Sequence, residues 1–163
     1  MIIFIYILVS AALLGIFYQD LSSRKIHIGL PVLLMGSLIG LSYYNGFFDV
    51  QSMVDILVFI ALNMIGVTLY FSLKNKKFVN PLSSYIGLGD ILFLVAIVPL
   101  FILKSYMLFF ITGMIFSLLL YIIFKKRLNF ESIPLAGYLS AYLGILLFIN
   151  SLTVGNLFRT LYF

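Results

Sequence analysis

The chain has 163 residues, of which 64% are hydrophobic and only 9% are charged. Soluble domains are about a quarter charged, so the composition excludes an ordinary soluble domain and predicts a protein surrounded mostly by lipid. The chain has no cysteine and one histidine, which excludes disulfides, thiolate zinc sites, cysteine nucleophiles and histidine metal clusters. Its net charge of +5 lies in short clusters between apolar runs, a pattern that indicates membrane topology and no nucleic-acid partner.

Six apolar segments follow one another along the chain, and each is predicted to be a transmembrane helix. Crossing the hydrocarbon core takes about 20 mainly apolar residues, and the segments that meet or approach this length are residues 2–18, 28–45, 53–73, 88–103, 105–124 and 133–150. In the fourth segment, Pro99 is expected to kink the helix or end it early. Continuous apolar runs exclude the alternating strands of a membrane barrel. We therefore predict an all-α polytopic bundle of six transmembrane helices that forms one domain, residues 1–163.

The basic residues predict the orientation of this bundle. Eight of the ten follow the first, third and fifth segments: Arg24, Lys25, Lys74, Lys76, Lys77, Lys125, Lys126 and Arg127. By the positive-inside rule that side is cytoplasmic. The chain is therefore expected to be a multi-pass protein of the cytoplasmic (inner) membrane, with the N-terminus and the C-terminus outside.

Small residues recur four positions apart within three of the segments. The pairs are Gly36 and Gly40, Gly113 and Ser117, and Ser140 and Gly144. Such pairs let helices approach closely in lipid. They predict packing within the chain, and a homodimer through one of these faces is the alternative.

Five acids are present, and two of them carry the functional prediction: Asp20, Asp49, Asp55, Asp90 and Glu131. Asp20 ends the first segment and Asp90 begins the fourth, so the topology places both at the cytoplasmic face. Two neighbouring carboxylates do not both ionise easily and share a proton. The ionised one can activate a water while the protonated one donates to a peptide bond, which is aspartic peptide hydrolysis without a metal or a cofactor. Gly87 and Gly89 would weaken the helix and let an extended substrate backbone reach Asp90.

Each of these acids also has a structural interpretation. Asp90 could be the N-cap of its helix, and Asp20 could pair with Arg24 one helical turn away. We favour the catalytic interpretation because both acids are expected on one face of a chain with few acids. Arg24 and His27 are candidate neighbours of the site, and His27 alternatively is a polar residue at the membrane boundary.

The remaining acids are expected to support helix ends. Asp49 lies beside the third segment, and Asp55 is predicted in its first turn, where a negative charge complements the helix dipole. Glu131 is expected to complement the start of the sixth segment ahead of Pro134. As a third acid on the same side, Glu131 is also a candidate neighbour of the site.

Three sequence stretches together resemble the type IV prepilin peptidase family of membrane aspartic proteases. They are "GLGD" at residues 87–90, "DLSSRKIHI" at residues 20–28 and "IPLAGYLSAYLG" at residues 133–144. The resemblance implies that Asp20 and Asp90 are the catalytic carboxylates and that Gly87 and Gly89 shape the second motif. It also implies a prepilin or pseudopilin substrate with a short basic leader and a hydrophobic helix, cleaved at the cytoplasmic face.

The chain departs from the family pattern in three places. The long cytoplasmic domain between the first two core helices is missing, which predicts peptidase activity without the N-methyltransferase activity of longer members. His27 and Ile28 stand where the family usually has Pro and Asn, and Leu92 stands where a lysine often occurs. These departures motivate the alternative of a non-enzymatic or degenerate scaffold in a pilus or secretion system. A small transporter with carboxylate ion sites is a third hypothesis.

Overall fold

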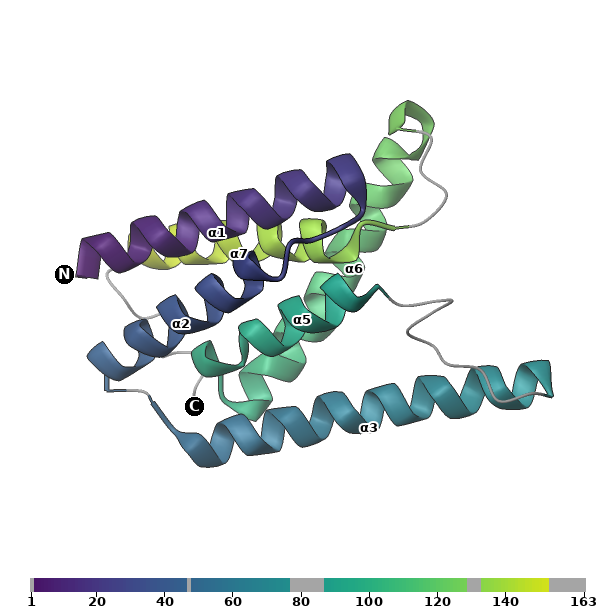
Figure 1. Ribbon diagram of the computed structural model, residues 1–163, viewed down its shortest axis with the longest axis horizontal. Coiled ribbons are helices and arrows are strands. Elements are labelled where there is room, and N and C mark those ends of the chain that lie inside the picture. The colour runs from purple at the N-terminus through teal and green to yellow at the C-terminus, as the bar shows by residue number, and fades with distance from the viewer. Residues whose placement is uncertain (1, 47, 77–86, 129–132, 153–163) are drawn as a thin grey trace.

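The computed structural model describes residues 2–46, 48–76, 87–128 and 133–152, with side chains described except at 126–128 and 151–152. The described part is helical and contains no strand, which confirms the all-α prediction for it (Figure 1). The helices are α1 (Ile2–Ser23), α2 (Gly29–Tyr44), α3 (Val50–Asn75), α5 (Leu88–Ala96), α6 (Leu103–Leu128) and α7 (Leu135–Leu152), with a 3₁₀ turn, η1 (Val98–Leu100), between α5 and α6. Each predicted segment therefore contains a helix.

Three of the helices are long and apolar enough to cross a membrane, namely α1, α3 and residues Leu103–Lys125 of α6. The apolar helices at Gly29–Tyr44, Leu88–Leu100 and Leu135–Asn150 are shorter. The 16 residues of α2 span about 24 Å, less than the ~30 Å of the hydrocarbon core. Length and composition thus support membrane-spanning helices for half of the six segments.

The fourth segment ends early at Pro99, as the sequence predicts. α5 stops at Ala96 and the chain continues as the 3₁₀ turn that contains Pro99. Two hydroxyl groups bind carbonyl oxygens around this break: Ser42 of α2 donates to the Pro99 carbonyl, and Tyr106 of α6 donates to the Leu94 carbonyl at 3.1 Å. These bonds satisfy carbonyl groups near a buried helix end and fix α5 against both neighbouring helices.

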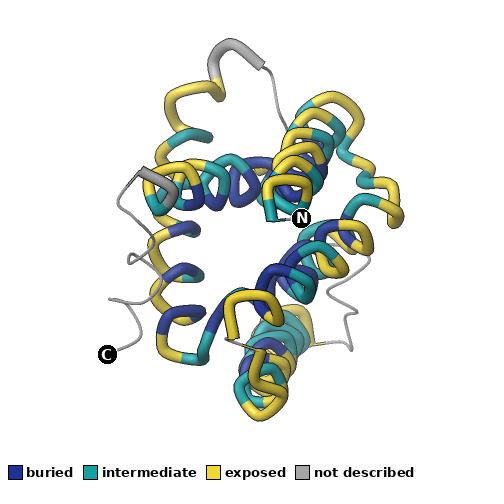
Figure 2. The backbone as a smooth tube through the Cα atoms, turned by 90° about the vertical axis from the view of Figure 1, so that its left-hand side faces the viewer, coloured by how far each residue is buried: buried dark blue, intermediate teal, exposed yellow. Residues whose placement is uncertain are grey.

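The core lies around α1. Its buried side chains recur every three or four residues: Val9, Ala12, Leu13, Ile16 and Asp20. This spacing forms one stripe along the helix, and α1 packs most extensively against α2 and α7. Figure 2 shows the buried parts of these helices turned toward one another. The stripe ends in a carboxylate, which is the first sign of a polar site at this end of the core.

The small-residue pairs have different surroundings. A Cβ atom on Gly113 of α6 would lie 2.6 Å from Leu139 of α7, and Ser117 one turn later is buried. This pair therefore serves packing within the chain, as predicted. Gly36 of α2 and Gly144 of α7 have no atom within 4 Å of an added Cβ, so both face open space.

One end of the molecule gathers the features that the sequence placed on one membrane face. The carboxyl ends of α1, α3 and α6 and the amino ends of α5 and α7 lie toward the right of Figure 1. α3 packs mainly on α6 and η1 and is largely exposed along its length. The amino end of α7, in contrast, lies against α1 and α5.

Candidate active site

Asp20 lies in the last turn of α1 and is 6% exposed. It follows Ile16 by four residues and therefore continues the buried stripe of this helix. A carboxylate is seldom buried without partners that stabilise it. Its position thus requires a donor from another part of the fold.

Asp90 lies in the first turn of α5 and is half-buried. The N-cap of this helix is Gly87, and its carbonyl accepts from the Asp90 amide at 3.0 Å. The alternative that Asp90 is itself the N-cap is therefore wrong, because Asp90 lies three residues inside the helix boundary. Its carboxylate points to a donor outside α5.

Both donors are backbone amides in the first turn of α7. The Gly137 amide donates to Oδ2 of Asp20 at 2.6 Å, and the Ala136 amide donates to Oδ1 of Asp90 at 2.8 Å. The first amides of a helix have no intrahelical acceptor, and the helix dipole favours anions there. Three covalent bonds separate the two amide nitrogens, so the accepting oxygens lie within about 10 Å of each other. One helix terminus therefore brings the two predicted catalytic residues together.

Gly137 makes the approach of α1 and α7 possible. A Cβ atom at this position would lie 3.1 Å from Oδ2 and 3.2 Å from the Cβ atom of Asp20, and 3.5 Å from the Phe17 carbonyl oxygen. A side chain here would press directly on the carboxylate. The glycine is therefore part of the site, although sequence reasoning did not single it out.

The two glycines of the "GLGD" stretch have distinct surroundings. A Cβ atom on Gly89 would lie 2.7 Å from the Cδ1 atom of Ile26, so this glycine lets α5 pack on the segment between α1 and α2. A Cβ atom on Gly87 would lie 3.1 Å from Oδ2 of Asp90. Gly89 thus has a role in helix packing. The predicted role of both glycines, access for a substrate backbone, stays a prediction.

The predicted neighbours of the site have different positions. Arg24 directly follows α1, adopts a left-handed conformation with φ of 56°, and is close enough to act electrostatically on both Asp20 and Asp90. His27 is exposed, and its Nδ1 atom accepts from the Gly29 amide at 3.2 Å, at the start of α2. This contact gives His27 a structural role at a helix end. Glu131 lies outside the described residues.

Tyr138 is a further residue near the site that sequence reasoning missed. It follows Gly137, is 2% exposed, and its hydroxyl has no hydrogen-bond partner among the described residues. Asp20 and Arg24 both act electrostatically on this hydroxyl. A buried hydroxyl without a partner is rare in native structures. Only its place four residues after Pro134, in the first turns of a predicted helix, could have indicated it.

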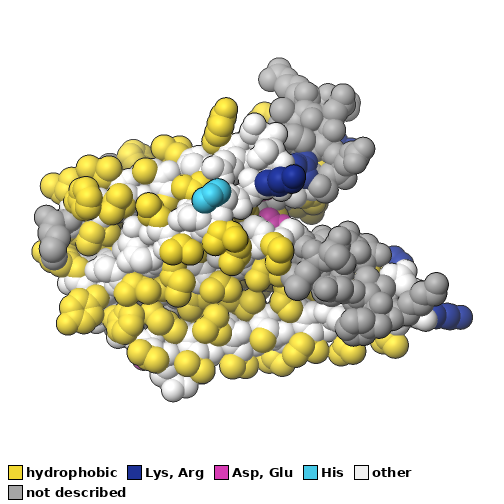
Figure 3. Space-filling model, in the orientation of Figure 1, with side chains coloured by type: hydrophobic (Ala, Val, Ile, Leu, Met, Phe, Trp, Pro, Cys, Tyr) yellow, Lys and Arg dark blue, Asp and Glu magenta, His cyan; other side chains and the backbone are white. Residues whose placement is uncertain are grey.

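The site can divide acid and base roles between two groups. Hydrogen bonds from the Gly137 and Ala136 amides hold one oxygen of each carboxylate, Oδ2 of Asp20 and Oδ1 of Asp90. The Gly87 backbone also hydrogen-bonds to the Asp90 carboxylate. Figure 3 shows acidic atoms in a hollow of the surface beside basic side chains. Within the described ranges, no three His, Cys, Asp or Glu side chains form a group that could hold a metal ion. A site that works without a metal stays a prediction.

Comparison of the chain with protein-family models, with curated proteins and with solved structures finds no match.

Proposed function

We propose that this protein is a membrane aspartic endopeptidase that uses Asp20 and Asp90 to cleave the leader peptides of prepilin-like or pseudopilin-like proteins. The observation that carries the proposal is the pair of hydrogen bonds from successive amides of α7 to these two carboxylates. A fold that needs only a packed core gains little from placing two acids at one buried helix end, because charges lose hydration there. Acid–base chemistry gives the arrangement a use.

In the proposed reaction, one aspartate is ionised and the other carries a proton. The ionised carboxylate takes a proton from a water as the water oxygen attacks the peptide carbonyl carbon. The protonated carboxylate donates to the carbonyl oxygen, and the resulting tetrahedral intermediate collapses as the leaving nitrogen gains a proton. One water is consumed and one C–N bond is broken. The α7 amides keep each carboxylate in position. This positioning matters for the rate, because a small displacement of a catalytic group slows the reaction strongly.

The proposed setting is the cytoplasmic membrane, with six spans and both termini outside. Arg24 and Lys25 follow α1 and Lys74 lies in the last turn of α3, and the carboxyl ends of these two helices lie toward the same end of the molecule as the amino end of α5 (Figure 1). Under the positive-inside rule, this end faces the cytoplasm. The shorter helices α2, α5 and α7 would cross with local thinning of the bilayer or with neighbouring helices around them.

The resemblance to prepilin peptidases supplies the proposed substrate class. Five residues link α1 and α2, which leaves no room there for the extra domain of longer family members. We therefore propose leader cleavage without N-methylation.

The test is to incubate the purified protein in lipid with a prepilin of the same organism. We expect the parent to release the leader and both Asp20→Asn and Asp90→Asn to lose at least about 100-fold in rate, the lower end of what a general acid or base contributes. Asp49→Asn is the matched control, because it makes the same chemical change at an exposed acid beside α3. Full cleavage by either site variant would overturn the two-aspartate mechanism, and an uncleaved leader with the parent would favour the scaffold alternative.

A further inference from the structure

An apolar groove runs between α1 and α7 beside the site. It has a volume of about 650 Å³ and is lined by residues of these two helices. Its floor includes Leu13 and Leu147, which are 5% and 8% exposed, and its rims include Leu14 and Phe148, which are 68% and 64% exposed. The groove is therefore a lengthwise depression on the outer face of the helix pair.

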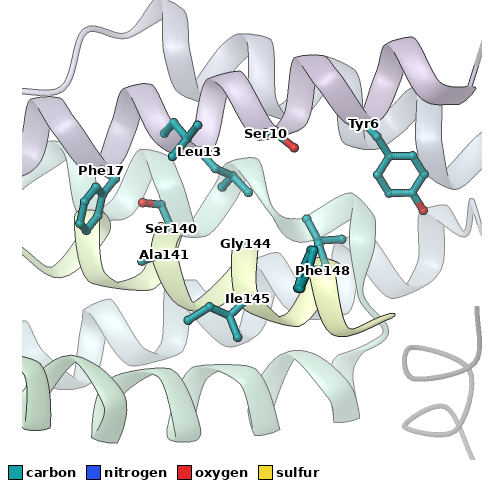
Figure 4. A pocket seen from close by; sticks show the side chains of 11 residues that line it. Tyr6, Ser10, Leu13, Phe17, Ser140, Ala141, Gly144, Ile145 and Phe148 are labelled. Atoms are coloured by element: carbon teal, nitrogen blue, oxygen red, sulfur yellow. The ribbon is translucent and has the colours of Figure 1, made fainter. Parts of the chain in front are cut away.

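One end of the groove lies one helical turn from Asp20 and from the Gly137 amide that holds it. Figure 4 shows Phe17 and Ser140 at one end and Tyr6 and Phe148 toward the other. Phe17 precedes Asp20 by one turn of α1, and Ser140 donates at 2.7 Å to the carbonyl of Gly137, whose amide holds Asp20. A chain that lies along the groove thus has one end near Asp20.

The groove extends along three turns of α1. The lining residues of α1 extend from Tyr6 to Phe17, a distance of about 17 Å along a helix axis, or three helical turns. Midway along α7, Gly144 has no atom within 4 Å of an added Cβ, so a neighbouring backbone could approach closely there. The Ser140 hydroxyl is already satisfied within its own helix, so the occupant needs no polar partner for it.

We propose that this groove holds the hydrophobic helix of the substrate, so that the peptide bond just before that helix lies at Asp20 and Asp90. The proposal rests on the proposed function and adds the surface by which the substrate is recognised. The ionised aspartate favours this occupant, because a basic segment just ahead of an apolar helix would meet its charge when the helix lies in the groove. A second copy of this chain or a lipid chain would have no reason to end at the carboxylates.

Cross-linking tests the occupant directly, since the chain has no cysteine of its own. Gly144→Cys and Ser10→Cys would be paired with single cysteines along the hydrophobic helix of a prepilin, in lipid vesicles. We expect disulfides between these positions and one face of the prepilin helix, and none from Gly36→Cys, which replaces an exposed glycine of α2. Disulfide-linked dimers of the peptidase chain through Gly144→Cys, or equal cross-linking of the prepilin to Gly36→Cys, would overturn the proposal.

Cleavage rates separate this proposal from the proposed function. Gly144→Leu should lower kcat/KM for the prepilin roughly tenfold or more, because the added side chain fills the place of a packed helix, whereas Gly36→Leu should cleave like the parent. If the parent cleaves, Asp20→Asn does not, and Gly144→Leu cleaves at the parent rate, the groove is wrong and the mechanism stands. If the parent does not cleave, the proposed function fails, and the cross-links still show whether an apolar helix binds the groove.

Discussion

Asp49 and Asp55 accept hydrogen bonds from residues two to four positions away, whereas Asp20 and Asp90 accept from residues 117 and 46 positions away, Asp90 in addition to a local bond from the Gly87 backbone. Asp49 caps α3 through the Gln51 and Ser52 amides. A local cap forms wherever its own helix forms. The long-range pair exists only when α1, α5 and α7 pack together.

The difference teaches how to tell a stabilising acid from a candidate catalytic one in this chain. An acid satisfied by its own helix contributes to that helix and to little else. An acid satisfied across the fold depends on the packing of helices far away in sequence, so substitutions that move those helices should change its chemistry. The predictions that follow test this dependence, from the largest effect to the smallest.

The largest effect is expected at the meeting point of α1 and α7. Gly137→Val should lower kcat/KM for leader cleavage about 100-fold, because a displacement of a catalytic group by ~1 Å has effects of this size. The added methyl groups would press on the Asp20 carboxylate, which already lies 3.1 Å from the position of a Cβ atom. Gly66→Val in α3 is the control, since no atom lies within 4 Å of a Cβ there. Equal rates for Gly137→Val and the parent would show that this contact does not position Asp20.

A smaller effect is expected where α5 meets the segment after α1. Gly89→Ala should lower the free energy of unfolding by about 1–3 kcal/mol through overpacking against Ile26, measured by thermal unfolding in detergent. Ile26→Ala removes the atom 2.7 Å from the new Cβ, so the double variant should be more stable than the summed effects of the two single changes predict. The rate of leader cleavage should rank these variants in the same order as their stability. Additive effects of the two single changes would mean that the strain lies elsewhere.

Tyr138 should separate stability from activity. Tyr138→Phe removes a buried hydroxyl without a partner, so the free energy of unfolding should rise by about 1 kcal/mol. Because Asp20 acts electrostatically on this hydroxyl, we expect kcat to fall about tenfold if it donates to the charge that develops on the substrate.

Ser117→Ala is the matched control for Tyr138→Phe. Ser117 of α6 carries the other buried hydroxyl without a partner among the described side chains. Its removal should raise stability in the same way and leave cleavage unchanged. A parallel response of both variants in the cleavage assay would deny Tyr138 any role in the reaction.

The smallest effect is expected at Asp49, whose hydrogen bonds come from its own helix. Hydrogen bonds from the Ser52 hydroxyl and the Gln51 amide lower the pKa of Asp49 below its usual 3.8. Its contribution to stability is therefore present above that value and is lost as the pH falls through the lower pKa of the folded state. Asp49→Ala should lower Tm by less than about 5 °C at neutral pH, and the difference from the parent should shrink in acid. Cleavage should not change.

Much of the helical framework could be predicted from the sequence, because long apolar runs and Pro99 carry direct local signals. The gathering of Asp20 and Asp90 at one end was predicted from the basic residues, through the topology that they indicate. The prediction that Asp55 lies in the first turn of α3 was wrong: the helix begins at Val50, Asp49 caps it, and Asp55 accepts from the Gln51 side chain at 3.1 Å.

The donors of the site could not be predicted. Ala136 and Gly137 act through backbone amides, which every residue except proline carries, so their side chains hold no sign of the contact. The packing of Gly89 on Ile26 was equally hidden, because it depends on the angle at which α5 approaches the link after α1. Sequence patterns report what a residue does for its own helix, and both contacts lie between helices.

The amides that hold the two acids belong to consecutive residues, so their separation is a property of the α-helix itself. Successive residues of α7 differ by about 1.5 Å in height and 100° in direction, and this fixed offset is passed on to the carboxylates. The spacing of the pair is thus independent of which side chain stands at position 135 or 136. Evolution could vary much of this turn and keep the same spacing of the two carboxylates, provided that the residue at position 137 stays small and proline never replaces either donor.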